Sequence, residues 1–150
     1  MDESLKARIL EFLDGALDMT LATIRDDGYP QATVVGFVHD DLTIYFGCDE
    51  DSQKAENIAR NSKVSLTVTL PYKSWNDICG LSAGADAHRI TDPGEIEKVG
   101  ALMFEKFPQI AEFVPSEEER EATAMFRVTP KVFSVIDYSK GFGHAELVAV

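Results

Sequence analysis

Hydrophobic residues follow a helical period at the start of the chain. Across residues 4–17 the apolar side chains recur about every four positions, at Leu5, Ile9, Leu10, Leu13 and Leu17. A helix with this spacing is apolar on one side only. The pattern predicts an N-terminal helix that lies against another layer of the protein.

From residue 19 the period changes to that of β-strands. Residues 19–25, 31–39 and 42–48 are rich in β-branched and aromatic side chains, and turn-forming residues separate them at 26–28 and 40–41. Segments of this kind predict three antiparallel strands in a meander.

Further strands are predicted in the second half of the chain. Residues 63–70 alternate between apolar and polar side chains, and residues 78–90 predict a fifth strand. Residues 124–129 and 132–138 predict a last strand or a pair of strands, because Pro130 lacks the N–H that a central strand needs.

Helices are predicted between these strands. Residues 51–61 form a short helix that Ser52 can cap, and a second helix begins after Asp92 and ends near 107–108. The acidic segment 109–121 predicts a solvated helix or loop on the rim, with nothing in it that indicates catalysis.

The order of these elements predicts an α+β, mainly β, fold. Hairpin-like strands separated by few helices favour a six-stranded antiparallel β-barrel with flanking helices, formed by residues 1–150 as one domain. Side chains fill a barrel this small, so a ligand of more than a few atoms must lie outside it, at a rim or at a subunit interface.

Charge and cysteine content narrow the range of partners. The chain has 14 Lys and Arg against 26 Asp and Glu, a net charge of −12, which makes a surface for nucleic acid or anionic lipid improbable. Cys48 and Cys79 are too few for a disulfide framework and lack the spacing of a zinc site. No segment reaches the ~20 apolar residues of a membrane span, and no signal peptide is evident, so we expect a cytoplasmic protein without a metal site.

The ordered set of motifs in residues 21–68 resembles the pyridoxamine 5′-phosphate oxidase-like, FMN-binding split-barrel family. The segment reads LATIRDDGYPQATVVGFVHDDLTIYFGCDEDSQKAENIARNSKVSLTV, and GADAHRITD at residues 84–92 resembles the family's fifth strand and the helix after it. The likeness covers most of residues 17–138. It implies a homodimeric split barrel with one FMN in each of two clefts between the subunits.

The resemblance also implies which residues contact FMN. The phosphate would meet Ser52, Gln53 and Lys54, where the family often has Ser-Arg-Lys. The flavin ring would lie along Thr33, Val34, Val35 and Gly36, with Phe46, Gly47 and Cys48 beside it.

The chemistry of the first helical turn fits a phosphate, although a simpler interpretation exists. Free N–H groups, the Ser52 hydroxyl and the Lys54 ammonium together form a phosphate cradle. Alternatively, Ser52 only caps the helix and Lys54 points into water. Gln53 stands where an Arg would make bidentate contacts, and the acids at 49–51 weaken the attraction for phosphate unless they turn away.

Gly36 and Trp75 have two interpretations each. Gly36 lies inside an apolar run, where glycine marks either a bend of the barrel or the close approach of a ligand to the backbone. Trp75, the only tryptophan, lies in a polar loop and is predicted to pack at a subunit interface or to cover the flavin.

The C-terminal tail supports a second hypothesis. Gly141, Phe142 and Gly143 precede His144 and resemble the C-terminal loop of haem-utilisation members of the split-barrel superfamily. The resemblance therefore allows haem as the ligand, and deazaflavin F420 in place of FMN, since relatives accept either flavin in the same cleft.

The sequence thus predicts an FMN-dependent oxidoreductase that acts on an unidentified small molecule. A haem-binding protein and a non-catalytic flavin-binding protein are the alternatives, because no residue is an obvious general acid or base. True pyridoxamine 5′-phosphate oxidase activity is not expected, since Arg127 is the only Arg after residue 120 and no C-terminal Arg-containing segment for pyridoxal phosphate is evident.

Overall fold

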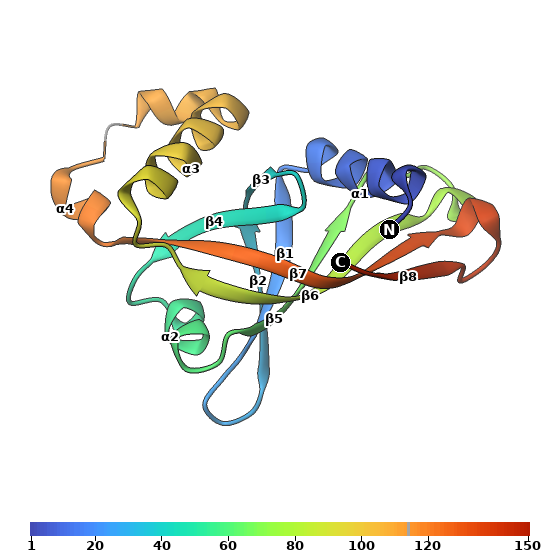
Figure 1. Ribbon diagram of the computed structural model, residues 1–150, viewed down its shortest axis with the longest axis horizontal. Coiled ribbons are helices and arrows are strands. Elements are labelled where there is room, and N and C mark those ends of the chain that lie inside the picture. Colours follow the sequence, from blue (N-terminus) through green and yellow to red (C-terminus); the bar gives the residue numbers. More distant parts are fainter. Residues whose placement is uncertain (114) are drawn as a thin grey trace.

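Eight antiparallel strands form one curled sheet in the computed structural model, which describes residues 1–113 and 115–150 (Figure 1). The strands are β1 (Asp18–Ile24), β2 (Pro30–Gly36), β3 (Val38–Asp40), β4 (Thr43–Asp49), β5 (Lys63–Thr69), β6 (Cys79–Arg89), β7 (Thr123–Asp137) and β8 (Ala145–Ala149). They are ordered β2-β1-β5-β6-β7-β4-β3, and β8 pairs with β7. The α-helices are α1 (Glu3–Gly15), α2 (Gln53–Arg60), α3 (Pro93–Lys106) and α4 (Glu117–Glu121), and the short 3-10 helices are η1 (Trp75–Asp77), η2 (Pro108–Glu112) and η3 (Tyr138–Lys140).

The antiparallel fold with flanking helices is confirmed, but the predicted count of six strands is wrong. The predicted strand 31–39 divides at Gly36 and Phe37 into β2 and β3, which pair with β1 and β4 respectively. The tail adds β8, because β4 covers only the first half of β7 and leaves the edge of residues 132–136 free for pairing.

The two ends of the strand order meet in the chain itself. β2 and β3 stand at opposite ends of that order, yet only Phe37 separates them in sequence. The sheet must therefore curl until its edges come together at this residue, as in a split barrel.

β7 runs without interruption past Pro130. Opposite it in β6, Gly84 pairs with Val132 and Ala85 with Pro130, so Lys131 is an extra residue in the ladder. The missing N–H of the proline falls at this bulge, where the ladder is already irregular. A single long strand therefore replaces the pair of strands that the proline suggested.

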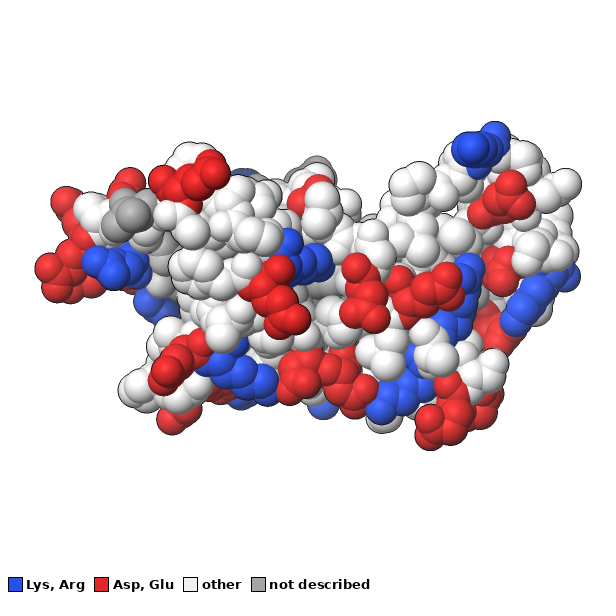
Figure 2. Space-filling model, turned by 90° about the horizontal axis from the view of Figure 1, so that it is seen from above, with Lys and Arg blue, Asp and Glu red and all other residues white. Residues whose placement is uncertain are grey.

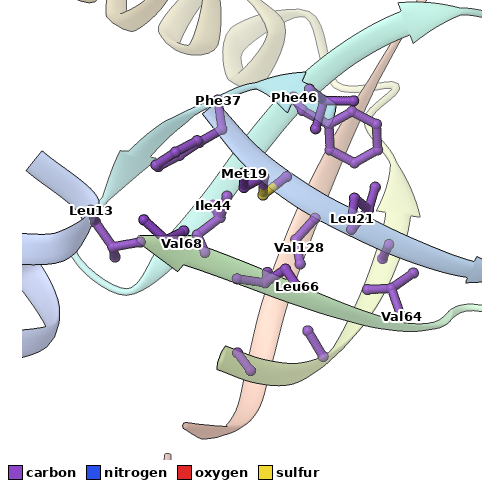
Figure 3. Packing of buried hydrophobic residues seen from close by; sticks show 14 of the residues in the cluster. Leu13, Met19, Leu21, Phe37, Ile44, Phe46, Val64, Leu66, Val68 and Val128 are labelled. Atoms are coloured by element: carbon purple, nitrogen blue, oxygen red, sulfur yellow. The ribbon is translucent and has the colours of Figure 1, made fainter. Parts of the chain in front are cut away.

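Large side chains fill the inside of the curled sheet, as the sequence predicted (Figure 3). Phe37, Phe46 and Phe133 are fully buried, and the ring of Phe46 stacks on that of Phe126 with centroids 5.1 Å apart. α1 covers this core with its one apolar side, through Ile9, Phe12 and Leu13. The packed interior leaves the outside of the sheet for any ligand.

α3 lies against the outside of the sheet near β4 and β7. It begins as predicted, with the Asp92 carboxylate accepting a hydrogen bond from the Glu95 N–H at 2.9 Å. Glu95 pairs with Arg127 of β7 at 2.6 Å, and Lys106, at the other end, donates to the Phe37 carbonyl at 2.8 Å. Both ends of α3 are thus attached to the sheet.

No helix in the described part of the chain has the length and hydropathy needed to cross a membrane.

Candidate ligand cavity between the sheet and helix α3

A large cavity lies outside the barrel, between the sheet and the segment that contains α3, η2 and α4. Its volume is about 920 Å³, and the residues that line it come mainly from β4, β7, α3 and the segment 107–123. Sites for small organic ligands commonly occupy ~300–1,000 Å³ and have mostly apolar walls. This cavity has that size and character, and it lies where a filled barrel leaves room.

Three of the predicted ring-contacting residues meet in this cavity. Gly36, at the end of β2, and Gly47 and Cys48, in β4, all line its wall. β2 and β4 are not adjacent in the strand order, so it is the curling of the sheet that brings these positions together.

The other predicted ring contacts lie on the strands beside the cavity. Phe46 and Val35 are buried with their side chains in the barrel core, which leaves their backbones for any ligand contact. Val34 is on the outer face and 70% exposed. The hydroxyl of Thr33 is buried and has no hydrogen-bond partner in the described residues, but Thr33 does not line the cavity and its side chain is on the same face of β2 as that of Val35.

Neither glycine of the cavity wall is required by the protein's own structure. Their backbone φ angles lie outside the left-handed region, and a Cβ at Gly36 would be 3.6 Å from the Phe107 ring. A Cβ at Gly47 would likewise be 3.6 Å from Thr123. Both distances are ordinary contacts, so the bend of the barrel does not demand glycine at Gly36. The close approach of something else to the backbone does explain it.

The N-terminus of α2 adjoins the cavity through Cys48. Ser52 caps α2 as predicted, accepting from the Ala55 N–H at 3.3 Å, and its hydroxyl donates to the Cys48 Sγ at 3.4 Å. Lys54, in the first turn, is half-buried and makes no ion pair within the described chain. The cap and the phosphate interpretation of Ser52 are therefore compatible.

The acidic residues before α2 are partly occupied by other contacts. Asp49 accepts a hydrogen bond from the Asp51 N–H at 2.8 Å, and Glu50 pairs with Arg89 at 3.0 Å. The Glu50 carboxylate is thus paired with a cation, which reduces its repulsion of a phosphate, whereas the Asp49 carboxylate stays at the turn that leads into α2.

Gln53 faces a buried polar network rather than the start of the helix. Its amide donates to Asn57 at 2.8 Å, and the fully buried Asn57 donates to Thr23 at 2.9 Å and to Gln31 at 3.2 Å. The network attaches α2 to the β1–β2 hairpin and so fixes the position of the Ser52 end.

Trp75 lies at the opposite end of the sheet from the cavity. Its ring is 65% exposed and stacks on Phe142 at 6.3 Å, with Tyr138 at the edge. We call these three rings the aromatic cluster. β6 and β7 run from the cavity, near Arg89, to this cluster, so within one chain the cluster does not reach the cavity.

His144 also lies at the cluster end. Its Nε2 is 3.0 Å from the Glu146 carboxylate, in the turn before β8. Among the described residues, no group of His, Cys, Asp and Glu converges as metal ligands do.

The lining residues between Ile96 and Phe113 are the part of the site that the sequence analysis missed. Ile110 and Phe113, in a segment predicted to be a solvated rim, line the cavity together with Phe104 of α3. The signal was present in their apolar side chains within an acidic segment, but only the fold shows that this segment turns back over the sheet.

Lys106 contacts the junction between β2 and β3. Its Nζ lies 3.7 Å from the centre of the Phe37 ring, in addition to its hydrogen bond to the Phe37 carbonyl. Partial burial lowers the pKa of Lys106 below the usual lysine value, against the opposing effect of Asp14 and Asp18.

Comparison with known proteins agrees with this architecture. The pyridoxamine 5′-phosphate oxidase family model matches residues 5–137, which is most of the chain. The chain belongs to this family. The suggested family resemblance is thereby confirmed.

The proteins that resemble this member of the pyridoxamine 5′-phosphate oxidase family have different names: a stress protein, a haem storage protein and an F420 reductase. General stress protein 26 of Bacillus subtilis (strain 168) is 31% identical over 75 residues, which are 50% of this chain and 53% of that protein. The chain thus matches about half the length of this curated relative. The haem storage protein HutZ of Vibrio cholerae has a TM-score of 0.69 at 23% identity, over 84% of this chain and 89% of that one. An F420 reductase has a TM-score of 0.64 at 23% identity, over 83% and 94%. At such identities the two structures support the fold alone.

Proposed function

We propose that this protein binds FMN non-covalently in the cavity beside Gly36 and Gly47 and acts, as a homodimer, as a flavin-dependent oxidoreductase on a small molecule. The observation that carries the proposal is the meeting of these two glycines on one cavity wall, although neither backbone conformation nor packing requires them. A flat ring lying against the backbone is what such a wall accommodates.

The residues present fit the ring of a flavin. Gly36 and Gly47 line the cavity and have no side chains of their own, so their backbone groups are available to a flat ring. When bound, FMN supplies the hydride and electron transfer, while the protein binds the ring, orients it and adjusts its electronics.

The start of α2 fits the phosphate. Its free N–H groups and helix dipole favour an anion, and the unpaired Lys54 ammonium adds a charge-assisted contact. Ser52 lies between this turn and the cavity through its contact with Cys48, which gives the ring and the phosphate one continuous surface.

A second copy of the chain is part of the proposal. The cavity is open to solvent on one side, and apolar side chains are exposed on β2 and β8, with Val34 at 70% and Leu147 at 77%. Association of two chains would bury such residues and exclude water from the ligand.

Haem is the second candidate ligand, and the position of His144 weakens the argument for it that came from the C-terminal tail. The His144 imidazole contacts Glu146 at the cluster end of the sheet and does not line the cavity. Haem binding through His144 would therefore need the partner's cavity. F420 and a non-catalytic flavin store remain outcomes of the test below.

The test is a titration with FMN monitored by the visible spectrum and by quenching of flavin fluorescence. The wild type is expected to bind FMN, and Gly36→Ala is expected to weaken binding at least about tenfold, because its Cβ fits the free protein but not the ligand-filled wall. Gly80→Ala is the matched control, since its Cβ also has its nearest side-chain carbon at 3.6 Å, the methyl of Thr69, but lies at the far end of β6 from the cavity. Equal FMN affinity in the wild type and in Gly36→Ala would contradict the proposal that the flavin ring lies against this wall of the cavity.

Lys54→Ala separates the phosphate from the ring. We expect about a tenfold loss of affinity for FMN and no change for riboflavin, which lacks the phosphate. If the wild type ignores FMN and instead shows a Soret band with haem, or binds F420, the cofactor assignment changes. Anaerobic reduction by nicotinamide cofactors then distinguishes an enzyme from a store.

A further inference from the structure

We propose that the α3 side of the cavity is a binding site for a flat, uncharged and apolar molecule. We call this part the α3 chamber; it is lined by Ile96, Gly100, Met103, Phe104, Ile110 and Phe113. That this molecule is the substrate rests on the proposed flavin function. The binding site itself rests only on the geometry and chemistry of the chamber.

Gly100 keeps the chamber open. It lies in the middle of α3, where glycine costs roughly 1 kcal/mol of stability relative to alanine. Its φ angle is outside the left-handed region, and a Cβ built on it meets nothing within 4 Å. Neither conformation nor packing explains this glycine, but the space that it leaves in the cavity wall does.

Exposed aromatic side chains form the walls. Phe104 is 54% exposed and Phe113 is 72% exposed, although both belong to elements that face the cavity. Other residues of α3, such as Val99 and Leu102, pack against β3, β4 and β7 in a small core of their own. α3 is therefore anchored through one side while the side with Phe104 is free to cover an apolar ligand.

The six residues that line the α3 chamber carry no charge. The charged residues of the cavity wall, Asp49, Arg89 and Arg120, are outside this set, and the Arg89 guanidinium is paired with Glu50 at 3.0 Å. From α4, Arg120 lines the cavity and the glutamates do not, and Figure 2 shows acidic side chains gathered at the end of the molecule where α4 lies. An ionic ligand in the chamber would lose its hydration without gaining a charged partner there, which favours an uncharged molecule.

The volume is consistent with two flat ligands side by side. At about 920 Å³ the cavity is near the upper end of the ~300–1,000 Å³ of small-molecule sites. Gly36 and Gly47 line the sheet side of the cavity, and Gly100 lines the helix side. Each side therefore has a surface without a protruding side chain, against which one ring can lie.

The test uses two fluorescent probes on the full chain: Nile red, which is neutral and flat, and anilinonaphthalene sulfonate, which is anionic. We expect Nile red to bind with a blue-shifted emission and at least tenfold more tightly than the anionic probe. Gly100→Leu fills the chamber and is expected to weaken Nile red binding at least tenfold. Ala101→Leu is the matched control, because it adds the same side chain on the exposed side of α3 and does not line the cavity.

Three results would overturn the proposal. The first is equal Nile red affinity in Gly100→Leu and Ala101→Leu, and the second is tighter binding of the anionic probe than of Nile red. The third is loss of Nile red binding in Phe142→Ala, because that loss would locate the probe in the aromatic cluster. Thermal melting of each variant establishes that it is folded.

Titration of the same variants with FMN separates this proposal from the proposed function. Gly100→Leu is expected to leave FMN affinity within about twofold, since Gly100 is not among the FMN contacts. If neither the wild type nor any variant binds FMN while Nile red binding still depends on Gly100, the proposed flavin function is wrong and the proposed binding site in the α3 chamber is supported. If FMN binds and Nile red binding does not depend on Gly100, the chamber fails alone.

Discussion

The inside of the barrel and the cavity under α3 are both apolar, but they are built in opposite ways. Phe37, Phe46 and Phe133 leave no room inside the barrel, and each is fully buried. The cavity has three glycines in its walls and partly exposed aromatic rings. The difference teaches that two apolar regions on the two sides of one sheet can differ in packing: the filled one stabilises the fold, and the open one is the region that we propose binds a ligand.

The largest expected effect comes from emptying the filled region. Phe46→Ala should lower the free energy of unfolding by ~3–5 kcal/mol, because it removes a fully buried ring stacked on Phe126. Phe104→Ala in the cavity wall should cost less than about 1 kcal/mol, since that ring is half exposed. Urea denaturation measures both values. Similar costs for the two variants would mean that the regions are not distinct.

A polar residue at the edge of the filled region gives the next largest effect. Asn57→Ala should cost ~1–3 kcal/mol, because Thr23 and Gln31 lose their buried partner. Gln53→Ala is the control, with a smaller expected cost, because Asn57 keeps its contacts with the hairpin. Since the network fixes α2, Asn57→Ala should also weaken FMN binding in the same titration. Unchanged FMN affinity would show that α2 needs no such anchor.

The smallest effect concerns Lys106, which lies where the two regions meet. Burial lowers the pKa of Lys106 in the folded protein, so between that pKa and the ordinary value of 10.5 the unfolded chain binds the proton more strongly. The unfavourable contribution of this charge is fully present below the folded pKa and is relieved as the pH rises towards 10.5. Stability relative to Lys106→Met should therefore increase over this alkaline range.

The pH prediction is checked by urea midpoints of both proteins across the alkaline range. Because the other titrating groups are shared, the difference between the two curves isolates Lys106. A difference that is constant or falls with rising pH would contradict the lowered pKa. The hydrogen bond to the Phe37 carbonyl would then dominate over burial.

Local signals predicted most elements of the fold correctly. Asp92 and Ser52 cap their helices as expected, and the alternation of residues 63–70 corresponds to β5. The strand count could not be obtained in this way, because the division at Phe37 and the addition of β8 depend on which edges remain unpaired in the finished sheet.

The candidate site was only partly accessible from the sequence. Gly36, Gly47 and Cys48 were found through the family motifs, and the structure brings them to one wall. Phe104 and Phe113 were not found, because the sequence around an aromatic residue does not indicate which part of the fold its ring will face. Only the return of α3 across β4 and β7 gives these rings a common cavity.

The junction at Phe37 has a consequence for engineering the chain. Since β2 and β3, at opposite ends of the strand order, are joined there, new termini introduced at this residue would separate the two edges of the sheet and expose them to pairing with other molecules. The exposed turn between Arg25 and Tyr29 joins strands that stay paired along their length, so circular permutants opened at that turn should retain the curled sheet.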